Sequence, residues 1–321
     1  MRNEKKRDEV LIVDDFHPAL LAGLSRLNFN FHYNPEITKE RILDIIENYT
    51  GLIVRSKIEC DVTFFEKAKQ LKWIAKGGSG IDSIDEEQTI KRKILIINAP
   101  EGNRNAVAEH TIGLLLNLTN NIAHACNSIK KLHWDREANR GIEISEKVMG
   151  IIGFGNIGEI LAKRLSGFDM KVLAYDKYKQ IKSPFAIEST LEQIFAEADY
   201  LSLHVPLTKE TKGMVNQAFI SQFKKPIGLI NASRGKVVVS KDVLQALELG
   251  QISFFGADVI ENERLKKWSI IESNTYTRLL SMQNVIITPH IAGWTRESYR
   301  KISETLIEKI EQEISLDAIK K

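Results

Sequence analysis

The sequence predicts an α/β protein with two doubly wound parallel-sheet domains. Short apolar runs of strand length alternate with helical patterns along almost the whole chain. The runs form two successive sets, and only the second contains a glycine-rich turn of G-x-G-x-x-G spacing, from Gly153 to Gly158. With 321 residues the chain is also long enough for two domains, each with its own core.

The first set of apolar runs belongs to the first third of the chain. Helical patterns over residues 38–49 and 61–69 separate some of these runs, and Asp61 supplies an N-cap for the second helix. The expected strands lie at residues 10–13, 51–55, 73–76 and 94–98.

The second set begins after a long helical stretch, expected from about Asn103 to Leu132, that crosses between the domains. A last helix, from Arg296 to about Ile314, is expected to pack back on the first domain. We therefore expect one domain of residues 1–100 and 290–321 and a second of residues 101–289. Strands of the second are expected at residues 148–152, 173–175, 200–205, 227–231, 256–259 and 285–288.

Composition excludes several classes of function. Hydrophobic residues at 43%, charged residues at 27% and a net charge of +3 are typical of a globular protein and give no electrostatic reason to expect nucleic acid. The most apolar long stretch, residues 106–123, contains Glu109 and His110, which indicates a buried helix and not a membrane span. The mixed charges before the first strand predict no secretory leader. Cys60 and Cys126 have neither metal-ligand spacing nor a disulfide framework, so we expect no metal and a cytoplasmic location.

The glycine-rich turn lies between an expected strand and an expected helix, which is the context of a dinucleotide-binding motif. Gly153 permits the tight turn, Gly155 lets a pyrophosphate approach the backbone, and Gly158 lets the helix pack closely on the sheet. Asp176 ends the next strand and can accept hydrogen bonds from both ribose hydroxyls. The alternative is an ordinary βαβ unit with an incidental glycine turn. Asp176, at the end of the next strand, argues against this alternative.

Three further motifs follow expected strands, at residues 231–235, 256–263 and 288–293, and they carry Arg234, Glu263 and His290. Together with four shorter motifs in the same order, they resemble the D-isomer-specific 2-hydroxyacid dehydrogenase family over nearly the whole chain. The shorter motifs are Gly78-Ser79-Gly80-Ile81-Asp82, Asn98-Ala99-Pro100, Val107-Ala108-Glu109 and Leu203-His204-Val205-Pro206-Leu207-Thr208.

This resemblance implies a flavodoxin-like substrate domain and a Rossmann NAD-binding domain with a cleft between them. It also implies an oxidoreductase that uses NAD and acts on the CH–OH group of a D-2-hydroxy acid. In that chemistry Arg234 binds the carboxylate and polarises the carbonyl, and His290 supplies the proton. Glu263 would orient the imidazole and favour its protonated form. Arg264 stands where the family usually has proline and the segment to Gln283 is longer than usual, so Glu261 remains an alternative to Glu263.

The resemblance also assigns supporting residues. The cofactor would contact the glycine motif, Asp176 and a set of strand-end residues, and the substrate carboxylate would be held by the backbone of Ser79 and Gly80. The further cofactor residues are Asn156, Ile157, Val205, Ala232, Ser233, Asp258 and Gly293.

Arg55 and Ser56 resemble the Arg-Ser pair with which phosphoglycerate dehydrogenases of this family hold the substrate phosphate, and Asn103 matches a further contact. The resemblance therefore favours oxidation of 3-phospho-D-glycerate, at the start of serine biosynthesis. Reduction of glyoxylate or hydroxypyruvate is the first alternative, because it uses the same machinery without the phosphate. An NAD(H)-sensing scaffold like the corepressors of this fold is the second alternative. The family also implies a homodimer, formed through the nucleotide domain and the helix after Asn103.

Overall fold

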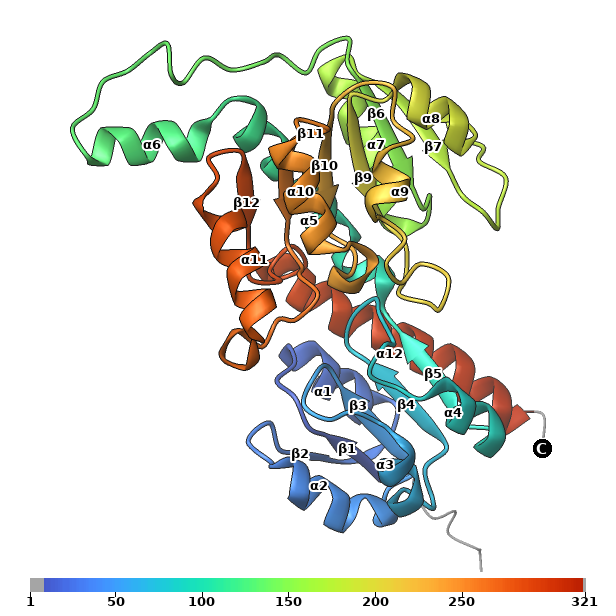
Figure 1. The fold of residues 1–321 in the computed structure, drawn as a ribbon. Coiled ribbons are helices and arrows are strands. Elements are labelled where there is room, and N and C mark those ends of the chain that lie inside the picture. The colour runs from blue at the N-terminus through green and yellow to red at the C-terminus, as the bar shows by residue number, and fades with distance from the viewer. Residues whose placement is uncertain (1–8, 320–321) are drawn as a thin grey trace, which may run out of the picture. The chain divides into compact units, whose positions relative to one another are not determined.

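The computed structural model describes residues 9–319, so the charged residues 1–8, expected to precede the first strand, lie outside it. The chain divides into two compact units, unit 1 with Met1–Asn103 and Trp294–Lys321 and unit 2 with Arg104–Gly293. Each unit is a parallel sheet with helices packed against it (Figure 1), which confirms the predicted fold class. No helix within residues 9–319 is long and apolar enough to cross a membrane.

Unit 1 is built on a five-stranded sheet of order β2-β1-β3-β4-β5, in which every neighbouring pair is parallel. The central strands are buried because both faces carry helices. Its strands are β1 (Glu9–Ile12), β2 (Asn30–Tyr33), β3 (Gly51–Val54), β4 (Trp73–Lys76) and β5 (Leu95–Asn98). Its helices are α1 (Pro18–Arg26), α2 (Lys39–Ile45), η1 (Ile46–Asn48), α3 (Val62–Lys67), α4 (Glu86–Arg92) and α12 (Arg296–Ile319).

The C-terminal helix α12 is part of unit 1. It packs against α1 through a buried cluster that includes Leu20, Leu24, Leu306 and Ile310. A Cβ atom on Gly23 would lie 2.5 Å from the side chain of Ile307, so the glycine allows the two helices to approach closely. The start and the end of the chain therefore share one core.

Unit 2 is built on a seven-stranded parallel sheet of order β12-β11-β10-β9-β6-β7-β8. Its strands are β6 (Val148–Ile152), β7 (Lys171–Tyr175), β8 (Ile187–Glu188), β9 (Tyr200–Leu203), β10 (Ile227–Asn231), β11 (Ile252–Ala257) and β12 (Val285–Ile287). Its α-helices are the larger part of α5 (Pro100–Thr119), α6 (Ile122–Lys130), α7 (Asn156–Leu165), α8 (Leu191–Glu197), α9 (Gln217–Ile220), α10 (Ser240–Glu248) and α11 (Ile270–Ser281). Its short 3-10 turns are η2 (Ser166–Phe168), η3 (Gly235–Val237) and η4 (Leu265–Lys267).

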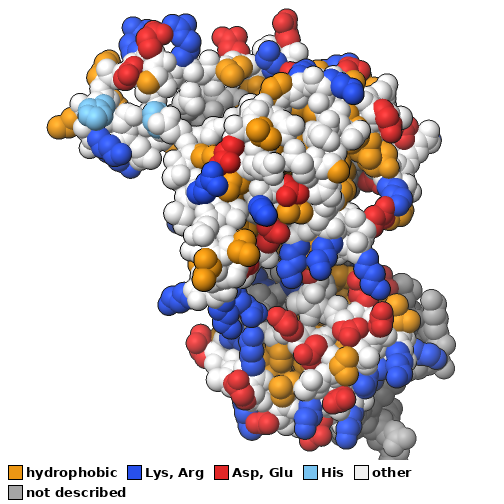
Figure 2. Space-filling model, in the orientation of Figure 1, with side chains coloured by type: hydrophobic (Ala, Val, Ile, Leu, Met, Phe, Trp, Pro, Cys, Tyr) orange, Lys and Arg blue, Asp and Glu red, His pale blue; other side chains and the backbone are white. Residues whose placement is uncertain are grey.

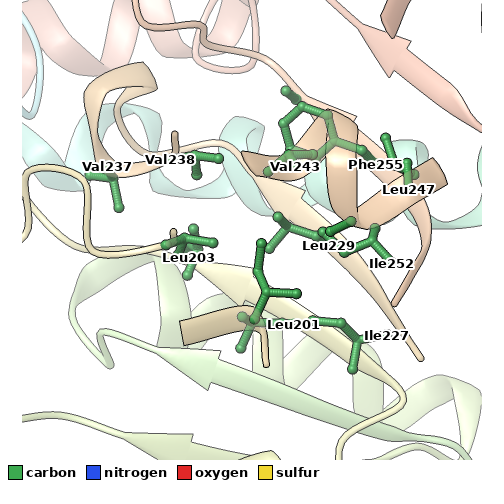
Figure 3. Packing of buried hydrophobic residues seen from close by; sticks show 14 of the residues in the cluster. Leu201, Leu203, Ile227, Leu229, Val237, Val238, Val243, Leu247, Ile252 and Phe255 are labelled. Carbon is green, nitrogen blue, oxygen red and sulfur yellow. The ribbon is translucent and has the colours of Figure 1, made fainter. Parts of the chain in front are cut away.

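The strand order of unit 2 reverses between β6 and β9. In such sheets the carboxyl ends of the strands on either side of the reversal form the usual ligand-binding position. A buried apolar cluster on one face of the sheet fixes these strands, with Leu229 and Phe255 packed near Val243 of α10 (Figure 3). The glycine motif follows β6, and Val205 follows β9.

The prediction of one continuous helix over residues 103–132 is wrong. The structure has two helices, α5 and α6, separated at Asn121, whose φ of 53° lies in the left-handed region and stops the helix. The segment of α6 and the loop after it extends away from the rest of unit 2 (Figure 1). Two edge strands were also missed, because β2 is largely exposed and β8 has only two residues.

Candidate active site

The glycine motif forms an open helix N-terminus. Gly153 has a φ of 89°, and a Cβ atom on Gly158 would lie 2.4 Å from the Gly153 carbonyl oxygen, so both positions require glycine. At Gly155 an added Cβ would meet nothing within 4 Å. Gly155 caps α7, which begins at Asn156, and makes no side-chain cap bond. The first N–H groups of α7 therefore have no side-chain cap, and an anion would be stabilised beside them.

Asp176 lies directly beside this motif. One of its carboxylate oxygens accepts a hydrogen bond from the backbone N–H of Phe154 at 2.9 Å. The other accepts from the N–H groups of Tyr178 at 3.0 Å and Lys179 at 3.3 Å. An uncapped helix, an open space at Gly155 and a carboxylate fixed by backbone donors fit the pyrophosphate and ribose of NAD.

Other predicted cofactor residues gather around the same motif. The side chain of Val205 borders Gly153, since a Cβ atom on that glycine would lie 3.0 Å from Cγ1 of Val205. Ile157 packs against a small buried cluster that contains Ala232 and Ala292. The start of α7 and the segments that follow β10 and β12 therefore meet in one apolar cluster, and Val205 after β9 borders the glycine turn.

The turn that carries Arg234 is fixed by the buried side chain of Asn231. The Asn231 amide oxygen accepts from the N–H of Ser233 at 3.0 Å and from its hydroxyl at 2.7 Å, while the amide nitrogen donates to the Arg234 carbonyl at 3.0 Å. Nη1 of Arg234 donates to the Ser233 carbonyl at 2.7 Å. A Cβ atom on Gly235 would lie 1.8 Å from the Ile260 carbonyl oxygen, so this turn is tight against the loop after β11.

Asp258 holds the loop that carries His290. Its side chain is almost fully buried and accepts from the Thr288 hydroxyl at 2.6 Å and from the N–H groups of Ile291 and Ala292, each at 2.8 Å. The backbone at His290 has a φ of 56°, a conformation that these bonds hold in place. Gly293 ends the loop and is the last residue of unit 2. Asp258 was expected to contact the cofactor, and its role in holding this loop was missed, although its position at the end of β11 was an available signal.

His290 forms an ion pair with Glu263. Nδ1 of His290 lies 3.0 Å from a carboxylate oxygen of Glu263, and this hydrogen bond raises the pKa of His290. Burial and the positive charge of Arg234 act in the opposite direction, but the pKa still rises. Glu261 instead accepts from the N–H of Ser240 at 2.8 Å. The geometry therefore pairs His290 with Glu263.

The unusual segment after Glu263 forms η4 and α11 and builds an apolar wall beside the pair. A cavity of about 310 Å³ there is lined by Leu265, Trp268 and Pro289 and reaches His290 and Glu263. Trp268 stacks on Tyr276 with ring centroids 4.7 Å apart. The side chains of His290 and Glu263 are 52% and 45% exposed, so this wall covers one side of the pair and leaves the other side open to solvent.

The predicted substrate residues of unit 1 lie at the carboxyl ends of β3 and β4. One oxygen of Asp14 accepts from the N–H groups of Arg55 and Ser56, at 2.6 and 3.1 Å. The Ser79 carbonyl, next to Gly80, accepts from the Asn98 side chain at 2.8 Å. The two turns are neighbours, because Nζ of Lys76 donates to the Arg55 carbonyl.

Asn103, the remaining predicted substrate residue, is the last residue of the first segment of unit 1. Its side-chain oxygen is buried and accepts no hydrogen bond from residues 9–319. Such an acceptor carries a desolvation cost that a bound donor would remove.

Comparison with known proteins identifies the family. A family model described as D-isomer specific 2-hydroxyacid dehydrogenase, NAD binding domain, matches residues 112–292. The chain belongs to this family. Its members are NAD-dependent oxidoreductases that act on CH–OH groups, and the glycine motif and Asp176 fit that cofactor.

Individual relatives carry different names. A hydroxypyruvate reductase from Thermotoga maritima is 34% identical over 87% of this chain and 90% of its own length. A D-3-phosphoglycerate dehydrogenase from Methanocaldococcus jannaschii is 32% identical over 95% of this chain but only 57% of its own length, so the chain spans little more than half of that relative. A D-lactate dehydrogenase from Aquifex aeolicus, solved with NAD and lactic acid, is 27% identical with a TM-score of 0.84 and coverage of 97% and 96%.

Proposed function

We propose that this chain oxidises 3-phospho-D-glycerate to 3-phosphohydroxypyruvate, with NAD as hydride acceptor. The observation that carries the proposal is the guanidinium of Arg55. It is half-buried at the end of β3, and among residues 9–319 it makes no hydrogen bond or ion pair. A cation with all its donors unused, held by its neighbours, is suited to a phosphate.

The chemical step is assigned to residues of unit 2. Arg234 binds the substrate carboxylate and polarises the C2–O bond. The glycine motif and Asp176 would hold NAD, which would supply the acceptor for the hydride of C2. The unprotonated Nε2 of His290 takes the C2 hydroxyl proton, and Glu263 fixes the ring through Nδ1 and stabilises the imidazolium that forms. In the reverse direction His290 returns this proton to the carbonyl oxygen.

The second candidate is reduction of hydroxypyruvate or glyoxylate. The observation that favours it is the relative of about this chain's length, which is named a hydroxypyruvate reductase. These substrates have no phosphate, so the two candidates differ in their need for Arg55.

Arg55→Ala separates the two candidates. We expect it to raise KM for 3-phosphohydroxypyruvate about ten- to a hundredfold and to leave glyoxylate almost unaffected, because a charge-assisted contact contributes about 1.5–3 kcal/mol. Arg41→Ala, which removes an exposed arginine of the same unit, is the matched control. Equal losses on both substrates would favour the candidate without phosphate. Absence of NADH oxidation with every oxo acid tested would favour the NAD(H)-sensing scaffold.

We also propose a cytoplasmic homodimer. The support for the cytoplasm is that Cys60 and Cys126 are both unpaired. The support for the dimer is α6 together with the loop after it. None of the residues of α6 is buried. This segment forms a protrusion with exposed apolar side chains (Figures 1 and 2), among them Ile122, Ile129, Leu132, Trp134 and Ile142. Replacing Ile129 and Leu132 by Asp should convert a dimer to monomers in light scattering, and a monomeric unmodified protein would contradict the dimer.

A further inference from the structure

Aromatic rings of unit 1 surround the guanidinium of Arg55. Cζ of Arg55 lies 4.2 Å from the ring centroid of Trp294, 5.9 Å from that of Phe16 and 6.0 Å from that of Tyr299. The distance to Trp294 is the shortest of the three and is a cation–π contact. Burial in this aromatic box lowers the pKa of Arg55, although the guanidinium remains charged.

Two aspartates fix the surroundings of the box. Asp14 binds the backbone N–H groups that follow β3, including that of Arg55. Asp15 accepts hydrogen bonds from the hydroxyls of Tyr33 at 2.9 Å and Tyr299 at 2.8 Å. Of the three rings, Tyr299 is therefore held by a hydrogen bond, while the N–H groups of the guanidinium have no such partner among residues 9–319.

Trp294 differs from the other two rings in its exposure. It is 67% exposed, whereas Phe16 is buried, so core packing does not account for a tryptophan at this position. It is also the first residue of unit 1 after the loop that carries His290. A flat ring on one face of the guanidinium leaves the N–H groups at the edge available and restricts the long side chain to few rotamers.

We propose that Trp294 is a positioning residue for substrate specificity. It holds Arg55 in the orientation in which the edge of the guanidinium binds a doubly charged distal group, such as a phosphate. This inference rests on the proposed role of Arg55. Preorganisation lowers the cost of binding that group, so Trp294 changes KM for a phosphorylated substrate and has little effect on a substrate without the phosphate.

The test compares variants on 3-phosphohydroxypyruvate and hydroxypyruvate. Trp294→Ala should raise KM for the phosphorylated substrate about two- to thirtyfold, the range of a cation–π contact, with kcat unchanged. Trp294→Phe keeps a ring and should restore most of the loss. The matched control is Ile90→Ala, which removes another exposed apolar side chain of unit 1. NADH affinity, measured by fluorescence, shows that each variant is folded.

A double-mutant cycle shows whether Trp294 acts through Arg55. In the Arg55→Ala background, adding Trp294→Ala should cause no further loss of selectivity. If the KM effects of the two substitutions multiplied in the double variant, the inference would be overturned. It would also be overturned if Trp294→Ala raised KM equally for both substrates. If Arg55→Ala changed the ratio of the two KM values and Trp294→Ala did not, the inference about Trp294 would be overturned and the proposed function would stand. A selectivity that Arg55→Ala leaves unchanged would overturn the proposed function and this inference together.

Discussion

Arg234 stands at a strand end whose turn is fixed by the Asn231 side chain, so its charge is preorganised. We predict that Arg234→Ala lowers kcat/KM of oxo-acid reduction by about 10²–10³, because the substrate loses its bidentate anchor and the group that polarises its carbonyl. NADH binding should remain nearly unchanged. The matched control is Arg278→Ala, which removes an exposed arginine paired with Glu248. A variant that keeps most of its activity would refute the assignment.

The ion pair of His290 with Glu263 predicts a pH effect. The hydrogen bond from Glu263 raises the pKa of His290, so the proton donor of the reduction persists to a higher pH than an ordinary histidine would allow. In Glu263→Gln this pKa falls, and the decline of the reduction rate with rising pH should begin at a lower pH. Glu261→Gln is the control, because Glu261 binds the Ser240 backbone. If only Glu261→Gln shifted the profile, the pairing would be wrong.

Asp176 predicts a preference for NAD over NADP. The 2′-phosphate of NADP would meet its carboxylate, and contact between like charges costs several kcal/mol, or about a hundredfold or more in affinity. Lys177 could offset this charge, but it is paired with Glu210. Glu210→Gln should therefore reduce the preference for NAD over NADP, because it removes the carboxylate that pairs with Lys177. Fluorescence titration with NADH and NADPH measures both effects, and equal affinities in the unmodified protein would exclude the role of Asp176.

At the scale of the element, the glycines at the start of α7 give a paired test. Gly158→Ala would place its Cβ 2.4 Å from a backbone oxygen, so it should lower the free energy of unfolding by about 1–3 kcal/mol and also weaken NADH binding. Gly155→Ala meets no atom within 4 Å, so it should leave thermal stability unchanged and weaken NADH binding alone. If both variants lost the same thermal stability, the open space at Gly155 would serve the fold and not cofactor binding alone.

The sequence predicted buried elements better than exposed ones. Continuous apolar runs identified β3, β4 and β10, because strands of a parallel sheet are buried on both faces. β2 has no such run, since it is an edge strand with mostly exposed residues. The break at Asn121 could not be read from periodicity, because asparagine also occurs within helices.

In the candidate site, too, some residues could be predicted from the sequence and others could not. Motifs led to the groups to which we assign the chemistry, including Arg234 and His290, because their residue types follow strands at characteristic places. Residues that contact these groups or their loops were missed: Trp294 lies against Arg55, and Asp258 accepts hydrogen bonds from the loop of His290. Their contacts join segments far apart in sequence, which spacing alone does not reveal.

In the whole molecule, the residues proposed for the chemical step and those proposed for substrate selection belong to different units. Unit 2 carries the glycine motif, Arg234 and the His290–Glu263 pair, while unit 1 carries Arg55 and its aromatic box. Family membership establishes the class of reaction, and the residues of unit 1 are the ones proposed to select the substrate. A hydroxypyruvate reductase and a D-3-phosphoglycerate dehydrogenase match this chain with 34% and 32% identity, so these matches do not decide its substrate.

If Arg55 binds a phosphate as proposed, the unmodified enzyme prefers a phosphorylated substrate. The most direct measurement is the steady-state oxidation of NADH with 3-phosphohydroxypyruvate, hydroxypyruvate and glyoxylate, each over a range of concentrations under one set of conditions. The account predicts the highest kcat/KM for 3-phosphohydroxypyruvate, through a KM about ten- to a hundredfold lower than for hydroxypyruvate. A kcat/KM for hydroxypyruvate or glyoxylate that equals or exceeds that of 3-phosphohydroxypyruvate would contradict it.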